Sequence, residues 1–107
     1  MENDQEEAGL EWQVGVWDRI SRIYLQEVDQ RFAPVVENVV ARAELKSGQQ
    51  VLDLGTGTGA VMERVAPVVR PRGDVVGIDI SRDMLALAQQ RLAGRRLTNV
   101  SLREGRA

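Results

Sequence analysis

An aspartate and three glycines form the group of residues with the clearest chemical potential in this sequence. The glycines occupy alternate positions directly after a short apolar segment: Gly55, Gly57 and Gly59. Asp53 lies inside that segment, residues 51–54. A strand that leads through a glycine-rich turn into a helix is typical of nucleotide-binding corners. Glycine permits the tight turn and lets a ligand lie against bare backbone, and the helix offers unpaired N–H groups.

A second aspartate, Asp79, ends another apolar segment and fits either of two ligand classes. A carboxylate that binds a ribose is expected about 20 residues after the glycine-rich turn, and Asp79 follows Gly55 at a similar separation. The glycines match the dinucleotide fingerprint G-x-G-x-x-G/A, with Ala60 in the last position, and also a tighter G-x-G-x-G turn. The glycines alone therefore leave both ligand classes open.

Asp53 favours a ligand with positive charge. It lies shortly before Gly55, on a strand expected to point into the binding crevice. In such a poorly screened site its carboxylate would repel the pyrophosphate of a dinucleotide. The same carboxylate would attract an ammonium and a sulfonium group, which S-adenosylmethionine carries. The two helices expected before this strand agree, because a dinucleotide domain often begins with the strand itself.

Hydrophobic patterning predicts two helices followed by alternating strands and helices. Five apolar residues fall on one face of a first helix: Val16, Trp17, Ile20, Ile23 and Tyr24. A second helix is expected to begin at Pro34. Strands are predicted at 50–54, 75–80 and 100–103. The resulting fold class is α/β, with a Rossmann-like parallel sheet that is incomplete: two N-terminal helices, then β-α-β-α-β. Near-continuous apolar strands predict that helices cover both faces of the sheet.

Helix signals refine these expectations. Pro67 should kink or end the helix that opens near Gly59. Ser81 is expected to cap the next helix, with Gly94 near its end. Three arginines near that end are expected to serve the helix dipole and solubility: Arg91, Arg95 and Arg96. Residues 1–10 are acidic and poor in apolar side chains, so we expect a flexible tail before a folded unit at 11–107.

Composition excludes several kinds of site. The 107 residues include neither Cys nor His, which removes disulfides, thiol nucleophiles, imidazole bases and the usual zinc ligands. With 14 basic and 16 acidic residues the net charge is −2, which gives no reason to expect a nucleic-acid or anionic-membrane partner. No signal sequence or membrane-length apolar run is found, so the cytoplasm is the expected location.

The sequence resembles the first half of a class I S-adenosylmethionine-dependent methyltransferase. The subgroup it resembles is that of the ubiquinone/menaquinone-biosynthesis C-methyltransferases. The resemblance extends over about residues 12–107 and is carried by three segments: VLDLGTGTG (51–59), GDVVGIDIS (73–81) and DMLALAQQRL (83–92). It implies S-adenosylmethionine as the cofactor and an acceptor that the sequence does not identify.

The resemblance also implies roles for matching residues. The methionine part of the cofactor would be lined by Asp53, Gly55, Thr56, Gly57 and Gly59. Asp79 would accept hydrogen bonds from both ribose hydroxyls, while Ile80 and Met84 would pack on the adenine. In the family a G-D-A segment after the third strand often reaches the adenine edge. Here Arg106 replaces its acidic residue, which leaves the backbone of Ala107 for that contact.

Two aromatic residues of the first helix carry alternative roles. N-terminal helices close over the cofactor in the family, so Trp17 and Tyr24 could do the same here. Core packing is the role we expect for both, because aromatic side chains fill cores readily.

The resemblance does not cover the part of the family that binds the methyl acceptor. The family's substrate-facing loops follow the third strand, where this sequence stops, so we expect a cofactor-binding half that is inactive by itself. No residue is assigned as a catalytic base. Two alternatives remain open from the residues: a segment of a nicotinamide-dependent oxidoreductase, and a non-catalytic cofactor-binding or interaction module.

Overall fold

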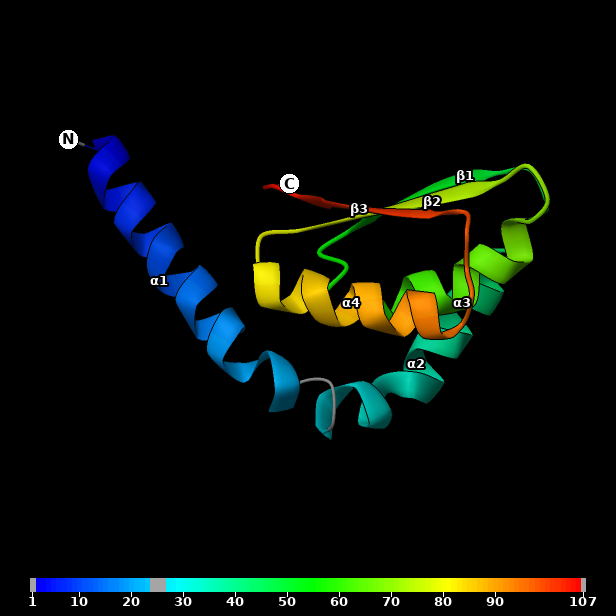
Figure 1. Ribbon diagram of the computed structural model, residues 1–107, viewed down its shortest axis with the longest axis horizontal. Helices are drawn as coiled ribbons and strands as arrows, with labels where there is room; N and C mark the ends of the chain where they lie inside the picture. The colour runs from blue at the N-terminus through cyan, green and yellow to red at the C-terminus, as the bar shows by residue number, and fades with distance from the viewer. Residues whose placement is uncertain (1, 24–26, 107) are drawn as a thin grey trace.

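The computed structural model describes residues 2–23 and 27–106, an α/β arrangement in which helices pack on a parallel sheet (Figure 1). Two helices, α1 (Glu2–Ile23) and α2 (Asp29–Arg42), precede the first strand. The following elements are β1 (Gln50–Leu54), α3 (Ala60–Val69), β2 (Asp74–Asp79), α4 (Arg82–Gly94) and β3 (Val100–Glu104). The element order predicted from the sequence is confirmed, and β1 has the predicted bounds.

The strands lie in the order β1-β2-β3, all parallel. Val51 is paired with Val75, which is paired with Val100 on its other side. This row belongs to the hydrophobic core between the sheet and two helices. The other core side chains come from α3, from α4 and from the segment that follows α4: Met62, Val65, Ala66, Val69, Leu92 and Leu97.

The described helices cover one face of the sheet, whereas the sequence predicted cover on both. Figure 1 shows α3 and α4 on the same side, with α2 packed beyond α3. Both crossovers run in the same direction along the sheet, and right-handed connections then place both helices on one face. On the opposite face of β1, Leu52 is 58% exposed and Leu54 is 54% exposed.

Two prolines lie inside helices. The prediction that Pro34 begins a helix is therefore wrong. Pro67 does not end its helix at once, and the kink named as the other outcome there stays a prediction. α2 begins five residues before Pro34, at Asp29, whose carboxylate pairs with α4. α3 continues past Pro67 to Val69, a fully buried core residue. In each case tertiary contacts outweigh the backbone hydrogen bond that a proline removes.

The region predicted to be a flexible tail contains helix, because residues 2–10 form the first part of α1. Glu, Gln, Ala and Leu are good helix formers, which accounts for a helix where apolar content is low. The side chains of residues 5–9 are exposed. This part of α1 therefore extends away from the sheet, as Figure 1 shows at the N-terminus.

Candidate functional site

A cavity of about 420 Å³ lies at the carboxyl ends of β2 and β3, between the glycine-rich turn and α1. Gly55 and Gly57 form one wall, and Asp79 stands at the end of β2. Ligands of open α/β sheets bind in this position, outside the carboxyl ends of the strands. The structure thus brings the two sequence motifs, the glycines and the second aspartate, to one site.

The three glycines of the turn have different surroundings. All have φ between +57° and +82°, the left-handed region that favours glycine. A Cβ on Gly55 would meet no atom within 4 Å, so this backbone is open to the cavity. A Cβ on Gly59 would lie 3.3 Å from Cβ of Ala88. Gly59 is buried and allows α3 to begin against α4; it supports the site without lining the cavity.

Asp79 fastens the glycine-rich turn to the end of β2. Its Oδ2 accepts a hydrogen bond from Gly57 N at 2.8 Å, and its Oδ1 accepts one from Ser81 N at 2.9 Å. The carbonyl of Asp79 also accepts from Gly105 N, at 3.0 Å, which ties in the segment after β3. An ionised carboxylate has about four acceptor positions, so Asp79 keeps capacity for hydroxyl donors in the cavity.

Asp53 lies under the turn, outside the residues that line the cavity. Thr56 Oγ1 donates a hydrogen bond to Asp53 Oδ2 at 2.8 Å. Burial raises the pKa of the Asp53 carboxyl above its ordinary value, although the hydrogen bond from Thr56 opposes the change. The nearby charge of Asp79 also raises this pKa. Two carboxylates therefore give this end of the site a negative character.

Gly77 is a residue of the site that the sequence reasoning missed. It is paired with Asp53 across β1 and β2. A Cβ at Gly77 would collide with Sδ of Met62 and would lie 2.9 Å from Thr56 Oγ1. The absent side chain thus makes room for Thr56 to reach Asp53. An isolated glycine in a strand pattern is the available signal, since it indicates close approach by another group.

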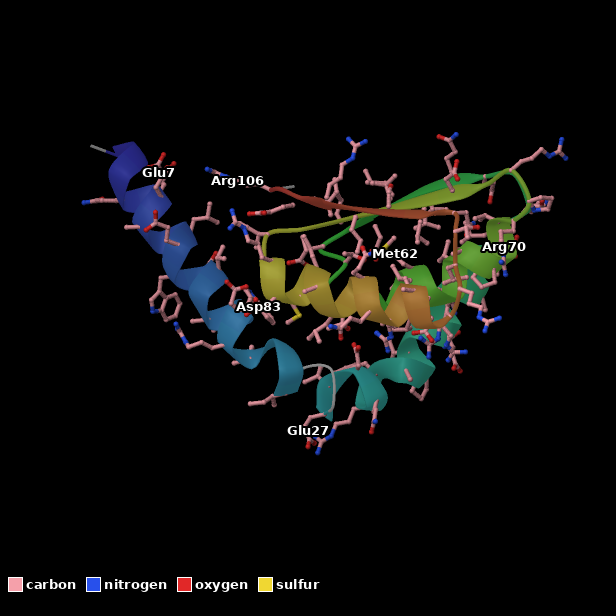
Figure 2. The ribbon with its side chains drawn as sticks, in the orientation of Figure 1. Glu7, Glu27, Met62, Arg70, Asp83 and Arg106 are labelled. Carbon is pink, nitrogen blue, oxygen red and sulfur yellow. The ribbon has the colours of Figure 1, made fainter. Side chains whose placement is uncertain are left out.

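The far wall of the cavity is mainly apolar. Ile80 and Met84, both singled out from the sequence, line it. Arg106 lines it as well, and its side chain extends from the end of β3 toward α1 (Figure 2). Ala107, the other residue expected at this end, lies outside the described residues. Met84 is nearly fully buried, so it contributes to core packing as well as to the cavity wall.

The first helix closes one side of the cavity through Leu10 and Trp17. Trp17 is 41% exposed and is absent from the core, which differs from the expected core packing. Tyr24, assigned the same role from the sequence, lies outside the described residues.

A pair of side chains fixes α1 in this position. Ser81 caps α4 as predicted, because its Oγ accepts from Met84 N at 3.2 Å. The Ser81 hydroxyl donates in turn to Asp18 Oδ1 of α1, at 2.5 Å. Figure 2 shows Asp83, in the same first turn, beside α1; its N–H donates to Asp18 Oδ1 at 3.3 Å. A carboxylate at a helix N-terminus is also favoured by the helix dipole.

Two of the three arginines near the end of α4 take part in ion pairs, where the sequence suggested dipole and solubility roles. Arg91 Nε lies 2.5 Å from Glu63 Oε2, and Arg95 Nε lies 2.8 Å from Glu63 Oε1. Arg91 also reaches the glycine-rich turn, because its Nη1 donates to the carbonyl of Thr58 at 3.2 Å.

Comparison with known proteins identifies the family. The sequence profile described as a methyltransferase domain matches residues 45–107, which include β1, the glycine-rich turn and Asp79. The chain belongs to the methyltransferase domain family.

The relatives of this methyltransferase domain include enzymes named for different acceptors. It is 38% identical over 90 residues to nocamycin O-methyltransferase of Saccharothrix syringae, a match that covers 84% of this chain and 32% of that protein. It is 40% identical over 53 residues to the ubiquinone/menaquinone biosynthesis C-methyltransferase of Coxiella burnetii, covering 50% of this chain and 21% of that protein. The subgroup resemblance is thereby confirmed. The chain spans about a third or less of the length of these curated relatives.

A solved structure gives the same fold. A SAM dependent methyltransferase from Aquifex aeolicus superposes with a TM-score of 0.60 at 28% identity, covering 87% of this domain and 45% of that chain. The alignment supports the Rossmann-like arrangement predicted from the sequence.

The described residues add two findings. Within residues 2–23 and 27–106, no helix combines the length and apolar character that crossing a membrane requires. The same part of the chain holds no group of three or more acidic, His or Cys side chains that could hold a metal ion.

Proposed function

We propose that this methyltransferase domain binds S-adenosylmethionine in the cavity beside the glycine-rich turn and orients it for methyl transfer. The observation that carries the proposal is the hydrogen bond from Gly57 N to Asp79 Oδ2 at 2.8 Å. It joins a backbone cradle and a ribose-binding carboxylate in one wall of the cavity. The cavity volume of about 420 Å³ lies in the range of small-molecule sites.

The residues fit the charge distribution of this cofactor. The open backbone at Gly55 lets a ligand approach without meeting a side chain. Asp53, Thr56 and Gly59 would support the methionine end of the cofactor from beneath the turn. The negative charge of Asp53 would favour the ammonium and sulfonium groups. A dinucleotide pyrophosphate would instead be repelled there.

The cavity from Asp79 to the apolar wall suits a nucleoside. Asp79 keeps acceptor capacity for ribose hydroxyls, and charge-assisted hydrogen bonds of this kind are among the strong ones. Ile80 and Met84 offer an apolar surface for the adenine ring. The backbone of Ala107 is proposed to reach the adenine edge, as the family resemblance implies.

The chemistry asks for orientation more than for reactive side chains. When bound, the sulfonium supplies an activated methyl group. The residues of this chain hold the donor in line with an acceptor and limit its motion, which lowers the entropic part of the barrier. We assign no residue as a general base. The acceptor is left open, because the two relatives carry O- and C-methyltransferase names.

The comparisons give the nicotinamide-dependent alternative no support, since the relatives and the solved structure described above are methyltransferases. The absence of a nucleic-acid partner and a cytoplasmic location stay predictions from the sequence.

Calorimetry tests the cofactor directly. S-adenosylhomocysteine, adenosine and NAD are titrated separately into the chain. We expect S-adenosylhomocysteine to bind more tightly than adenosine, because only the former presents an ammonium group to the negative end of the site. NAD should bind weakly or not at all. Tight NAD binding without any response to S-adenosylhomocysteine would contradict the proposed function.

A further inference from the structure

A network of charged side chains contacts the glycine-rich turn, and its members are not among the residues that line the cavity. Thr58, between Gly57 and Gly59, is 1% exposed. Its hydroxyl donates to the carboxylate of Asp29, the first residue of α2. Arg91 of α4 lies between these groups, with its Nη1 2.7 Å from Asp29 Oδ2 and 3.1 Å from Thr58 Oγ1.

The same arginine has a second anchor. Its Nε pairs with Glu63 of α3 at 2.5 Å, so one guanidinium contacts α2, α3 and the turn. The side chains of Asp29, Glu63 and Arg91 are all mainly buried. Such buried and mutually satisfied groups define a geometry more sharply than exposed ion pairs do.

We propose that Arg91, together with Asp29, is a positioning residue for the cofactor-binding turn. Asp79 holds the turn at Gly57, where both residues line the cavity, and Arg91 holds it at Thr58, where neither residue does. The inference rests on the proposed function in one respect, that the ligand of the turn is S-adenosylmethionine.

The physical basis is the intrinsic freedom of the turn. With glycine at three alternate positions, residues 55–59 have many accessible backbone conformations when nothing restrains them. Nη1 of Arg91 donates to a backbone carbonyl and a hydroxyl at the centre of this segment. Restricting the turn before the ligand arrives reduces the ordering entropy lost on binding, which raises affinity.

Arg95 provides a matched control for this role. It stands one helical turn after Arg91 and pairs with the other oxygen of Glu63, at 2.8 Å. The contacts of the described residues place Arg91, and not Arg95, on Thr58. Arg91→Met and Arg95→Met therefore each remove one positive charge and one contact to Glu63. They differ in the contacts to the turn and to Asp29, which Arg91 makes.

Hydrogen exchange of the chain without ligand is the first measurement. Arg91→Met should accelerate exchange at Gly57 and Gly59, by at least about fivefold relative to the amides of β2. Arg95→Met should leave this ratio unchanged. Thr58→Val, a milder variant that keeps the backbone carbonyl, should give a smaller increase. Equal acceleration throughout the chain in Arg91→Met would show a general loss of stability and would overturn the proposal.

Affinity for S-adenosylhomocysteine is the second measurement, made well below the melting temperature of each variant. Arg91→Met should weaken binding by roughly three- to thirtyfold, the effect typical of residues that act on a site without touching the ligand. Arg91→Lys should recover part of the loss, because an ammonium can bind Asp29 or Thr58 but lacks the planar fork. Asp29→Asn should weaken binding, and less than additively with Arg91→Met.

The two measurements separate the two proposals. If the unchanged chain binds no S-adenosylhomocysteine, the proposed function fails, and the exchange comparison still decides whether Arg91 holds the turn. If it binds and Arg91→Met behaves like Arg95→Met in both measurements, the positioning role fails while the proposed function stands.

Discussion

Ser81 and Asp18 lie 63 residues apart in the sequence, yet the Ser81 hydroxyl donates to Asp18 Oδ1 across 2.5 Å. Ser81 is completely buried, and its oxygen also caps α4. This contact joins α1, which closes one side of the cavity, to α4, the helix that follows Asp79. The carboxylate of Asp18 therefore contributes to the position of α1 over the cavity.

Removing that carboxylate should loosen α1. Hydrogen bonds to charged groups contribute about 1.5–3 kcal/mol, so we expect Asp18→Ala to accelerate amide exchange in residues 10–20 and to weaken S-adenosylhomocysteine binding several-fold. Glu7→Ala, in the exposed part of the same helix, is the control and should change neither. Unchanged exchange of α1 in Asp18→Ala would contradict the fastening role of this contact.

Asp79 should dominate the affinity for the cofactor. Asp79→Ala removes the proposed ribose acceptors and the hydrogen bond to Gly57 N, and should weaken S-adenosylhomocysteine binding by about tenfold to a few hundredfold. Asp79→Asn should lose less, because an amide oxygen still accepts one bond. Glu104→Gln is a suitable control, since Glu104 is paired with Asp79 across the strands but faces Arg82 at the surface. Calorimetry that found equal losses in Asp79→Ala and Glu104→Gln would contradict the assignment.

Asp53 should make stability depend on pH in a defined direction. Its pKa is raised in the folded chain, so the folded state holds this proton more tightly than the unfolded state does. Stability from this group is therefore greatest at low pH, and it is lost as the pH rises from about 4, the ordinary aspartate value, through the raised pKa. Asp53→Asn removes this loss and keeps an acceptor for Thr56. Thermal melts should show similar stability of both chains near pH 4 and a more stable variant at pH 7.

The same variant should respond selectively to ligands. Asp53→Asn should weaken binding of S-adenosylhomocysteine more than binding of adenosine, because only the former carries an ammonium group. A variant that is less stable than the unchanged chain at pH 7 would contradict the stated direction of the pKa shift. An equal effect on both ligands would contradict the electrostatic role.

Gly77 should be intolerant of even a methyl group. The new Cβ of Gly77→Ala would collide with Met62 and crowd Thr56, so we expect a loss of about 1–3 kcal/mol in the free energy of unfolding. Gly94→Ala is the matched control: its Cβ would meet nothing within 4 Å, and it should be neutral or slightly stabilising as the last residue of α4. Denaturant unfolding measures both, and equal effects would show that the space at Gly77 is not limiting.

Local signals in the sequence predicted much of this fold. The β1 strand has its predicted bounds. The β2 strand is shifted by one residue from the predicted range, and β3 ends one residue later than predicted. Short apolar runs between turn residues are strong strand signals, and Ser81 before an acidic first turn is a strong capping signal. The start of the helix that contains Pro34 was predicted wrongly, because α2 begins at Asp29, whose ion pair with Arg91 does not show in the local sequence pattern.

The site was predictable only where its residues belong to a continuous motif. The glycines, Asp53 and Asp79 lie next to strands whose ends must meet at one edge of a parallel sheet. Asp18, Arg91 and Gly77 act through partners that are distant in sequence or through a missing side chain. No periodicity encodes the pairing of Ser81 with Asp18, or of Thr58 with Arg91. Those pairings follow from how α1 and α4 pack in three dimensions.

The place of Trp17 in the cavity wall has an optical consequence. The chain contains only two tryptophans, and the other, Trp12, is 68% exposed. Indole emission is sensitive to the polarity of its surroundings and to contact with an aromatic ring. A Trp12→Phe chain would therefore carry a single tryptophan, in the wall of the cavity. Occupation of the site would change the colour or intensity of that emission without any attached label.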